Sequence, residues 1–345
     1  MQKLITNIHL SNLRKNALAF RRLTESKLCA VVKADAYGHG AIEVVNALYT
    51  IADFFAVALV EEGLEIRSAA AEKDVLVFTP PTCEKEAVVA IRNQLVLTVA
   101  DVPSAKLIAL VCKRYDVSAR VHIKVNTGMN RYGVNVDELS RLCRYLKRQR
   151  HVRVQGIFSH LYTTDEATCH CQRREFENAL AIAKQYFSPL TAHLAATYGA
   201  TLGKAFAYDA VRIGLGLYGY MPVPCPRLAL LPVMRAYALC VGNHIYRSGG
   251  VGYGASAKIV GLQGKRISLL RAGYGDGIGL LPFYKALPLL NRCCMDVSFV
   301  RKNVGRGKEV ALFSSAQELA DAQGTIVYET LCRLGMRAER RYKDE

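Results

Sequence analysis

The chain has 345 residues, of which 51% are hydrophobic and 22% are charged, and its formal net charge is +17. This length suits one large domain with a smaller one, and the composition excludes an intrinsically disordered chain. The sequence has no uncharged apolar run of about 18 residues and no apolar segment near its start, so neither a membrane-spanning helix nor a signal peptide is expected.

The cysteines and the positive charge further limit the cellular compartment and the class of partner that we expect. Eleven cysteines without an export signal predict reduced thiols in the cytoplasm. Basic residues concentrate at 141–153 and 333–343 without a nucleic-acid-binding motif. Nucleic-acid binding is therefore an alternative that we do not expect. The same positive charge would equally attract a small molecule that bears a phosphate. Cys169, His170 and Cys171 stand too close together for the usual zinc pairs, so no metal site is predicted.

Apolar runs and amphipathic helical patterns alternate from the N-terminus to residue 214. About eight repeats of strand and helix are typical of a parallel barrel with helices outside, so we predict a (β/α)8 TIM-type barrel. Ser11 is the expected N-cap of the first helix. The expected strands span residues 4–10, 28–33, 54–59, 74–78, 96–99, 119–125, 152–159, 192–195 and 210–214. The expected helices span residues 12–24, 41–51, 61–71, 83–92, 103–115, 136–149 and 171–187.

The pattern changes after Gly219, where Pro222, Pro224 and Pro226 interrupt it. Strands with glycine-rich turns dominate from there on, and we expect little helix except near residues 315–322. The sequence thus predicts a barrel over residues 1–225 and a smaller β-rich C-terminal domain over 226–345. The expected C-terminal strands span residues 233–241, 258–260, 266–271 and 296–300.

One strand ends in a lysine. The apolar residues 30–32 lead to Lys33, and a small-residue turn with Tyr37 and two glycines follows. The turn between a strand and a helix is where α/β proteins place their chemistry. A desolvated lysine loses its charge easily and forms a Schiff base with a carbonyl cofactor. The alternative is that Lys33 extends from the strand end into solvent.

Other polar residues also follow predicted barrel strands. Because parallel strands end on one face of a barrel, these side chains are expected to meet there. Arginine suits carboxylates and phosphates through its bidentate geometry. Any one of these residues could form an ordinary ion pair at a strand end. Together, at one mouth of the barrel, they predict a binding or catalytic site. The residues at these strand ends are Lys124, Arg131, His160, His193, Thr197 and Arg212.

The lysine turn, VKADAYGHG at residues 32–40, resembles the cofactor-lysine signature of the alanine racemase family. These are pyridoxal 5'-phosphate (PLP) enzymes of fold type III, with alanine and serine racemase branches. Their layout of a (β/α)8 barrel followed by a β-rich domain is the one predicted above. The resemblance covers nearly the whole chain. It recurs in KVNTGMNR at 124–131, RIGLGLYG at 212–219, VGYG at 251–254, AGYGDG at 272–277 and CCMD at 293–296.

The resemblance implies roles for residues of the barrel. Lys33 would bind the cofactor and act as the base on the D-face of the substrate. Arg212 would face the pyridine nitrogen, and His193 would support Arg212. Lys124 would be carbamylated and would direct Arg131 towards the substrate carboxylate, although Asn126 stands where the family has aspartate. The other cofactor-binding residues implied are Tyr37, His160, Thr197, Gly214 and Leu215.

The resemblance also implies roles for the C-terminal domain. Tyr253 would be the second acid–base residue, on the L-face, with His160 as its partner. Tyr274 would narrow the entrance, and Met295 and Asp296 would line the substrate site. In the family these C-terminal residues come from the partner subunit. A homodimer with shared active sites is therefore expected.

The function implied is that of an isomerase, an amino-acid racemase that interconverts L- and D-alanine and supplies D-alanine for peptidoglycan. Three departures leave the substrate open. Ala196 and Thr197 replace an asparagine and a serine, and Met336 stands where the family has a tyrosine. Serine or a broader set of amino acids is the alternative substrate. A barrel protein that binds PLP without racemising is the alternative activity.

Overall fold

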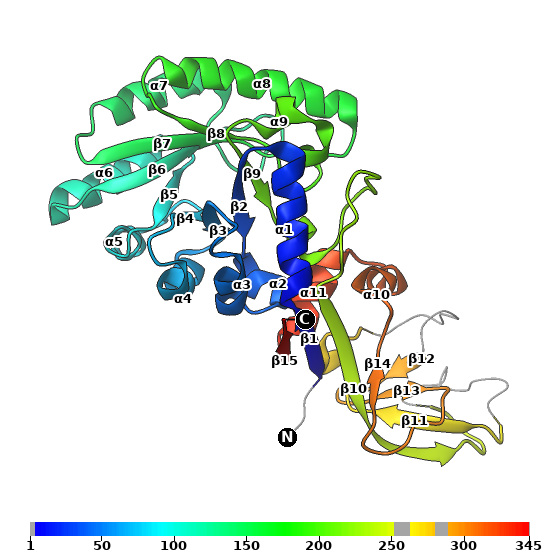
Figure 1. The fold of residues 1–345 in the computed structure, drawn as a ribbon. Coiled ribbons are helices and arrows are strands. Elements are labelled where there is room, and N and C mark those ends of the chain that lie inside the picture. The colour runs from blue at the N-terminus through cyan, green and yellow to red at the C-terminus, as the bar shows by residue number, and fades with distance from the viewer. Residues whose placement is uncertain (1–3, 252–262, 280–288, 345) are drawn as a thin grey trace. The chain divides into compact units, whose positions relative to one another are not determined.

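The computed structural model describes residues 4–251, 263–279 and 289–344 (Figure 1). Contacts within the chain divide these residues into two units. The barrel unit comprises Leu13–Ala34 and Ala41–Leu230. The β-rich unit comprises residues 4–12, Asp35–Gly40 and the described residues from Leu231 onward. These units differ from a single division near residue 225 because two short N-terminal segments belong with the β-rich unit.

The barrel unit is built on one parallel sheet of eight strands, in the order β8-β7-β6-β5-β4-β3-β2-β9. Two further backbone bonds, from Asp209 N–H to the Ala192 carbonyl and from Arg212 N–H to the Ala195 carbonyl, join the segments at its two edges. The predicted barrel is therefore confirmed. Its strands are β2 (Lys27–Val31), β3 (Phe54–Val57), β4 (Val75–Val77), β5 (Val96–Val99), β6 (Ala119–Lys124), β7 (Val152–Phe158), β8 (Thr191–His193) and β9 (Ala210–Ile213).

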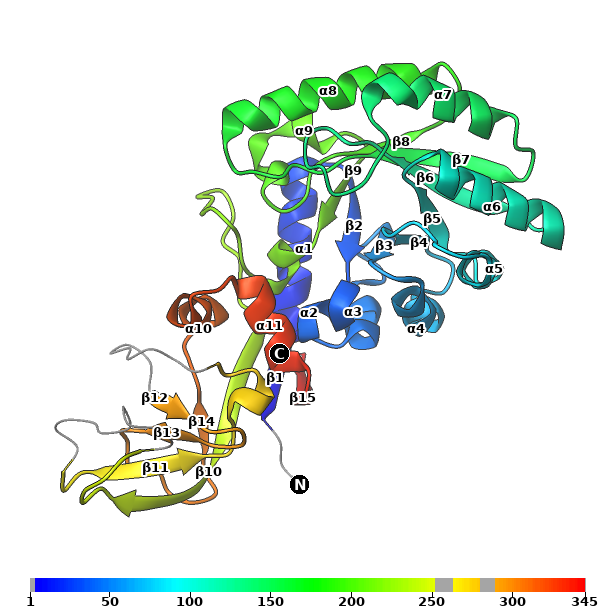
Figure 2. The ribbon, with the colours of Figure 1, turned by 180° about the vertical axis from the view of Figure 1, so that it is seen from behind.

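Strands β3, β4 and β5 are short and consist mostly of apolar residues, because both of their faces are covered. Every residue of β3, β4 and β5 is buried. Helices α3 to α8 follow the outer side of the sheet in both views of the molecule (Figures 1 and 2). The helices of this part of the chain are α1 (Leu10–Thr24), α3 (Ala41–Leu48), α4 (Val60–Ala70), α5 (Glu84–Arg92), α6 (Val102–Tyr115), α7 (Val136–Lys147), α8 (Glu166–Lys184) and α9 (Lys204–Ala207).

Capping side chains set several helix starts. Asp101 accepts a hydrogen bond from Ser104 N–H at the start of α6. Asp165 accepts one from Thr168 N–H, so α8 begins at Glu166, earlier than the expected start at residue 171. An aspartate at this position satisfies a backbone donor that has no partner within the helix.

The β-rich unit holds a second sheet, in the order β12-β13-β11-β10-β1-β15, with β14 paired to β10. Strand β1 is antiparallel to β10 and parallel to β15. The N-terminal strand therefore lies outside the barrel, because its hydrogen-bonding partners come from the C-terminal third of the chain. The strands are β1 (Ile5–His9), β10 (Met234–Ile245), β11 (Arg266–Leu270), β12 (Leu289–Cys293), β13 (Ser298–Val300), β14 (Glu309–Ala311) and β15 (Glu339–Lys343).

Two helices accompany this sheet. Helix α10 (Ala316–Gln323) agrees with the helix expected near 315–322, and Ser315 caps it by accepting from Glu318 N–H. Helix α11 (Val327–Gly335) was not expected, although Val327, Leu331 and Leu334 form a buried stripe along it. The strand expected at 258–260 lies outside the described residues. No helix in the described ranges is long and apolar enough to cross a bilayer.

Candidate active site

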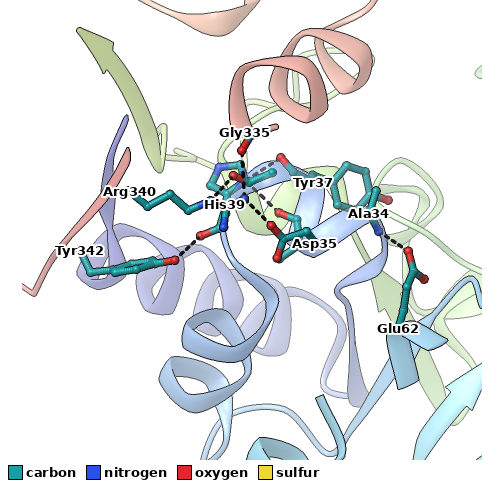
Figure 3. Close-up of polar contacts among 10 residues, drawn as sticks. Ala34, Asp35, Tyr37, His39, Glu62, Gly335, Arg340 and Tyr342 are labelled. Atoms are coloured by element: carbon teal, nitrogen blue, oxygen red, sulfur yellow. Dashed lines mark hydrogen bonds and ion pairs between the residues drawn. The ribbon is translucent and has the colours of Figure 1, made fainter. Parts of the chain in front are cut away.

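The turn after β2 has an unusual backbone. Ala34, Asp35, Ala36 and Tyr37 all have φ between 51° and 54°, so the short helix α2 (Lys33–Gly38) contains a left-handed turn. Four residues that are not glycine pay about 1–2 kcal/mol each for this conformation. At its start the Ala34 N–H donates to Glu62 Oε1 at 2.7 Å (Figure 3). Lys33 is half-buried at the point where the strand gives way to this turn.

Arg212 is a buried charged group that several hydrogen bonds hold in place. It lies in β9 and is 3% exposed. Its guanidinium donates to the carbonyls of His193 (2.7 Å) and Leu194 (3.0 Å), to the Ser159 carbonyl, and to Nδ1 of His193 (3.0 Å). Nδ1 of His160 lies 3.3 Å away. Burial lowers the pKa of Arg212 to about 10, so the group keeps its charge at neutral pH.

These contacts fix the protons on two buried histidines. Arginine can only donate, so Nδ1 of His193 accepts and its Nε2 carries the hydrogen. Nε2 of His193 lies 2.9 Å from Nδ1 of His122, which therefore accepts in turn. Burial lowers the pKa of His122 to about 3 and that of His193 well below its ordinary value, so both rings are neutral. The His193 ring also stacks on Phe158, with centroids 5.0 Å apart.

His122 was missed by the sequence analysis. A single histidine in an apolar strand is unremarkable, but His122 stands two residues before Lys124 in β6. Side chains two apart on a strand share a face. That spacing was the signal that His122 lies beside the residues expected at the barrel mouth.

Lys124 is 2% exposed, and its Nζ donates to the Val125 carbonyl at 2.6 Å. Burial, reinforced by the charges of Arg212 and Arg131, lowers its pKa to about 7. Arg131 is exposed, with its guanidinium 5.3 Å from the centre of the Tyr132 ring. No hydrogen bond joins Lys124 to Arg131 in the described structure.

His160 shows how the predicted barrel residues converge. Its pKa lies well below the ordinary value, first through burial and then through the positive charges of Arg212, Arg131, Lys124 and Lys33. Arg212 lies 3.3 Å from the ring, and the other three cations lie close enough for their charges to lower its pKa. Together these four positive charges create a field that attracts anions.

A second part of the barrel mouth follows β9. Gly216 N–H donates to Thr197 Oγ1 at 3.1 Å, at the start of the short helix η2 (Leu215–Tyr218). A side chain at Gly216 would place its Cβ 2.5 Å from the Phe20 ring and 3.0 Å from Thr197 Cγ2. Glycine is required there because the backbone passes so close to both groups. The hydrogen bond between Gly216 and Thr197 joins the segment after β8, which carries Thr197, to the segment after β9, which carries Gly214 and Leu215. The three residues expected to bind the phosphate therefore lie in two adjoining segments.

The residues expected from the C-terminal domain lie in the β-rich unit. The N–H groups of Tyr274 and Gly275 donate to the carbonyls of Cys294 and Met295, both at 3.0 Å. These bonds hold together the two loops that carry Tyr274, Met295 and Asp296, and all three side chains are exposed. Tyr37 is buried in the same unit, with its ring 6.0 Å from that of Tyr328. Tyr253 lies outside the described residues.

Comparison with known proteins agrees with this layout. Residues 8–222 match the family model "Alanine racemase, N-terminal domain", and residues 237–342 match "Alanine racemase, C-terminal domain". The alanine racemase of Symbiobacterium thermophilum is 32% identical over 98% of this chain and 96% of its own length. That of Streptococcus uberis is 32% identical over 98% and 97%.

Solved structures show the same relationship. The alanine racemase of Clostridium difficile 630 has a TM-score of 0.90 at 27% identity and covers 100% of this chain and 96% of its own. The enzyme of the D-cycloserine producer Streptomyces lavendulae has a TM-score of 0.91 at 26% identity, covering 100% and 98%. The chain belongs to the alanine racemase family.

Proposed function

We propose that this protein is a PLP-dependent alanine racemase that works as a homodimer. The observation that carries the proposal is the convergence on His160 of Lys33, Lys124, Arg131 and Arg212, beside a guanidinium fixed by neutral partners. An amine at a strand end and an immobile cation suit a carbonyl cofactor that also bears a phosphate. The exposed C-terminal loops with Tyr274, Met295 and Asp296 are assigned to the active site of the partner subunit.

The donor set fits this cofactor. Lys33 would hold it through its amine, Arg212 would contact the ring nitrogen, and Thr197, Gly214 and Leu215 would bind its phosphate. Tyr37 and His160 complete the set implied by the family. PLP, when bound, supplies an electron sink that acidifies the α-proton of an amino acid.

Arg212 limits the strength of that sink. It keeps its own proton, because its pKa remains about 10. Its two Nη groups donate to carbonyls and imidazoles, so Nε–H would be the donor to the ring nitrogen. Because arginine donates and does not give up its proton, Arg212 would leave the ring nitrogen of bound PLP unprotonated. The weaker sink would favour returning the proton to the α-carbon over side reactions such as transamination.

Racemisation needs an acid–base group on each face of the α-carbon. Lys33 would move the proton on the D-face and Tyr253 of the neighbouring subunit on the L-face. A phenol has an ordinary pKa of about 10 and needs a hydrogen-bonding partner to act as a base. His160 is assigned that role, since its imidazole is neutral.

Lys124 and Arg131 would orient the substrate carboxylate. With a pKa of about 7, about half of the Lys124 side chains carry a neutral amine at pH 7. Such an amine reacts with carbon dioxide to form an N-carboxylate and releases one proton. Carbamylation replaces a positive charge with a negative one, so the repulsion between Lys124 and Arg131 becomes an attraction.

Alanine is the first substrate proposed and serine the second. Met336, where the family has a tyrosine, is 81% exposed. A methionine side chain has more rotatable bonds than a tyrosine, which favours a more adaptable pocket. The cysteines whose side chains the structure describes are all free thiols, which fits the cytoplasm as the proposed location. Supply of D-alanine for peptidoglycan is the proposed role.

The test is α-proton exchange in heavy water with a chiral read-out, on purified protein with PLP and L-alanine, then L-serine. Loss of the α-proton with appearance of the D-isomer is expected, and the faster substrate identifies the preference. Exchange with retention of the L-isomer would show that Lys33 and Tyr253 are not an opposed pair. No exchange with bound PLP would favour a barrel protein that binds the cofactor without racemising.

A further inference from the structure

The left-handed turn after Lys33 needs contacts that hold it. A conformation that is costly for four successive residues persists only where the surroundings determine it. Asp35, Ala36 and Tyr37 belong to the β-rich unit, whereas Lys33 and Ala34 belong to the barrel unit. The contacts that hold the later part of the turn are thus to be sought in the β-rich unit.

Arg340 on β15 makes two contacts to the turn and a third to Gly335 at the end of α11 (Figure 3). Its Nη2 donates to the carboxylate of Asp35 and, at 3.1 Å, to the carbonyl of Gly335. Its Nε donates at 3.1 Å to the carbonyl of Gly38. One guanidinium therefore binds the turn both through a side chain and through its backbone. A lysine has no planar fork with which to match these acceptors.

Neighbouring groups complete the arrangement. The Tyr342 hydroxyl donates to the His39 carbonyl at 3.2 Å, and Nδ1 of His39 lies 2.9 Å and 3.0 Å from the carbonyls of Ala36 and Tyr37. Gly335 and Gly38 are in backbone contact, since a Cβ on Gly335 would lie 2.3 Å from Gly38 Cα. The end of α11 and the strand β15 therefore both contact the turn.

We propose that Arg340 is a positioning residue that keeps this turn left-handed and so fixes the direction in which the backbone presents Lys33, two residues before Asp35. The inference rests on the proposed function insofar as Lys33 carries the cofactor. An ion pair that only stabilised the surface would not require the two backbone acceptors, Gly38 and Gly335. Arg341, the next residue on β15, shows the contrast, because it pairs with the side chains of Glu309 and Glu339.

The turn can be observed directly by hydrogen exchange and mass spectrometry, on the full chain with and without PLP. The reporters are the N–H groups of His39 and Gly40, which donate to the carbonyls of Ala36 and Asp35. In Arg340→Met we expect exchange in peptides covering residues 36–40 to be about 10- to 100-fold faster. Unchanged exchange there would overturn the proposal.

Two further variants keep that test decisive. Asp35→Asn leaves the two carbonyl contacts of Arg340 intact, so a smaller acceleration is expected, and it replaces Arg340→Met if that chain does not fold. Arg341→Met is the control on the same strand and should leave the turn unchanged. Equal acceleration in Arg341→Met and Arg340→Met would show a general loosening of β15 and would also overturn the proposal.

The link to Lys33 is tested by borohydride reduction in the presence of PLP, followed by peptide mapping for a pyridoxyl group. We expect label on Lys33 in the unaltered chain. In Arg340→Met, kcat should fall by about 10- to 100-fold with little change in the KM for the amino acid, and Arg340→Lys should restore part of kcat. A purely structural role would lower the thermal midpoint and leave kcat unchanged below it.

The outcomes separate the two proposals. Absence of label on Lys33 in the unaltered chain would overturn the proposed function, and with it the role of Arg340 towards the cofactor. Label on Lys33 together with an unchanged kcat in Arg340→Met would overturn the positioning role alone.

Discussion

The barrel unit and the β-rich unit each hold an arginine within a polar network, and the two networks are built differently. Arg212 and His193 are 3% and 0% exposed, and the guanidinium is held by carbonyls and by imidazole nitrogens. Arg340 instead pairs with the carboxylate of Asp35, and these side chains remain 25% and 38% exposed. One network keeps a charge in the interior through neutral partners, and the other neutralises charge with charge near the surface.

This difference predicts how much stability each network loses when a side chain is substituted. Removing a donor from the buried network leaves acceptors that water cannot easily reach, and each such acceptor costs about 1–3 kcal/mol. Water can replace part of what is lost in the half-exposed network. Loss of one hydrogen-bond donor should therefore lower the free energy of unfolding more around Arg212 than around Arg340.

The largest expected effect comes from reversing the charge in the buried network. Arg212→Glu should lower racemisation by about 100-fold or more, because a preorganised donor is lost from the site. Transamination should rise relative to racemisation, since a carboxylic acid can protonate the ring nitrogen where arginine cannot. The ratio of pyruvate to D-alanine formed from L-alanine measures this. An unchanged ratio would remove the role assigned to Arg212.

Acid should weaken both networks, because each holds a neutral histidine. Burial lowers the pKa of His39 to about 4, whereas the unfolded chain titrates near the ordinary value of 6.5. Between these values only the unfolded state binds the proton. The contribution is therefore full above pH 6.5 and is lost as the pH falls to 4, by about 3 kcal/mol at most.

Urea unfolding at pH 7, 5.5 and 4.5 measures this dependence. His39→Gln should show a flatter profile than the unaltered chain. The pKa of His122 is lowered further, to about 3, so the barrel network should continue to lose stability below pH 4. A free energy of unfolding that stays constant from pH 7 to 4.5 in the unaltered chain would contradict the prediction.

A smaller effect is expected at the far end of the buried network. In His122→Leu the Nε2 hydrogen of His193 loses its acceptor at 2.9 Å, which should lower the free energy of unfolding by about 1–3 kcal/mol. His151→Leu is the control, because His151 is exposed. Equal losses of stability in the two variants would show that the contact between His193 and His122 does not contribute to the free energy of unfolding.

The smallest expected effect concerns carbon dioxide. Degassed protein should lose activity about tenfold, with a higher KM for alanine, and bicarbonate should restore it, because Lys124 would lose its carboxylate. A carbamate signal in ¹³C spectra with labelled bicarbonate should be present in the unaltered chain and absent from Lys124→Met. No signal in the unaltered chain would leave Lys124 as a plain amine.

The barrel was predictable because several of its strands are continuous apolar runs, such as 54–57 and 75–77, and a run of that kind needs little context. Strand β1 was assigned to the wrong sheet, since its partners β10 and β15 lie more than two hundred residues away in the sequence. Helix α11 was missed although its apolar stripe was visible. Pairing over such distances depends on tertiary contacts that a local pattern does not contain.

The candidate site likewise has a part that the sequence predicted and a part that it did not. Lys33, His160 and Arg212 follow from their places at strand ends, and the structure brings them together. The left-handed turn could not be read from the sequence, because Ala34, Asp35 and Tyr37 ordinarily favour right-handed conformations. Arg340, which we propose holds the turn, lies in a stretch that the sequence analysis described only as a basic run. The role of Tyr253 stays a prediction.

The distance along the chain between Asp35 and Arg340 also affects biosynthesis. The two residues are 305 positions apart, so at about 5–20 residues per second the turn emerges from the ribosome about 15 to 60 seconds before its clamp. The barrel strands can pair during that interval, but the turn after Lys33 cannot take its final form. A chain cut before Arg340 would therefore contain every strand of the barrel and still lack the guanidinium that binds Asp35 and the Gly38 carbonyl.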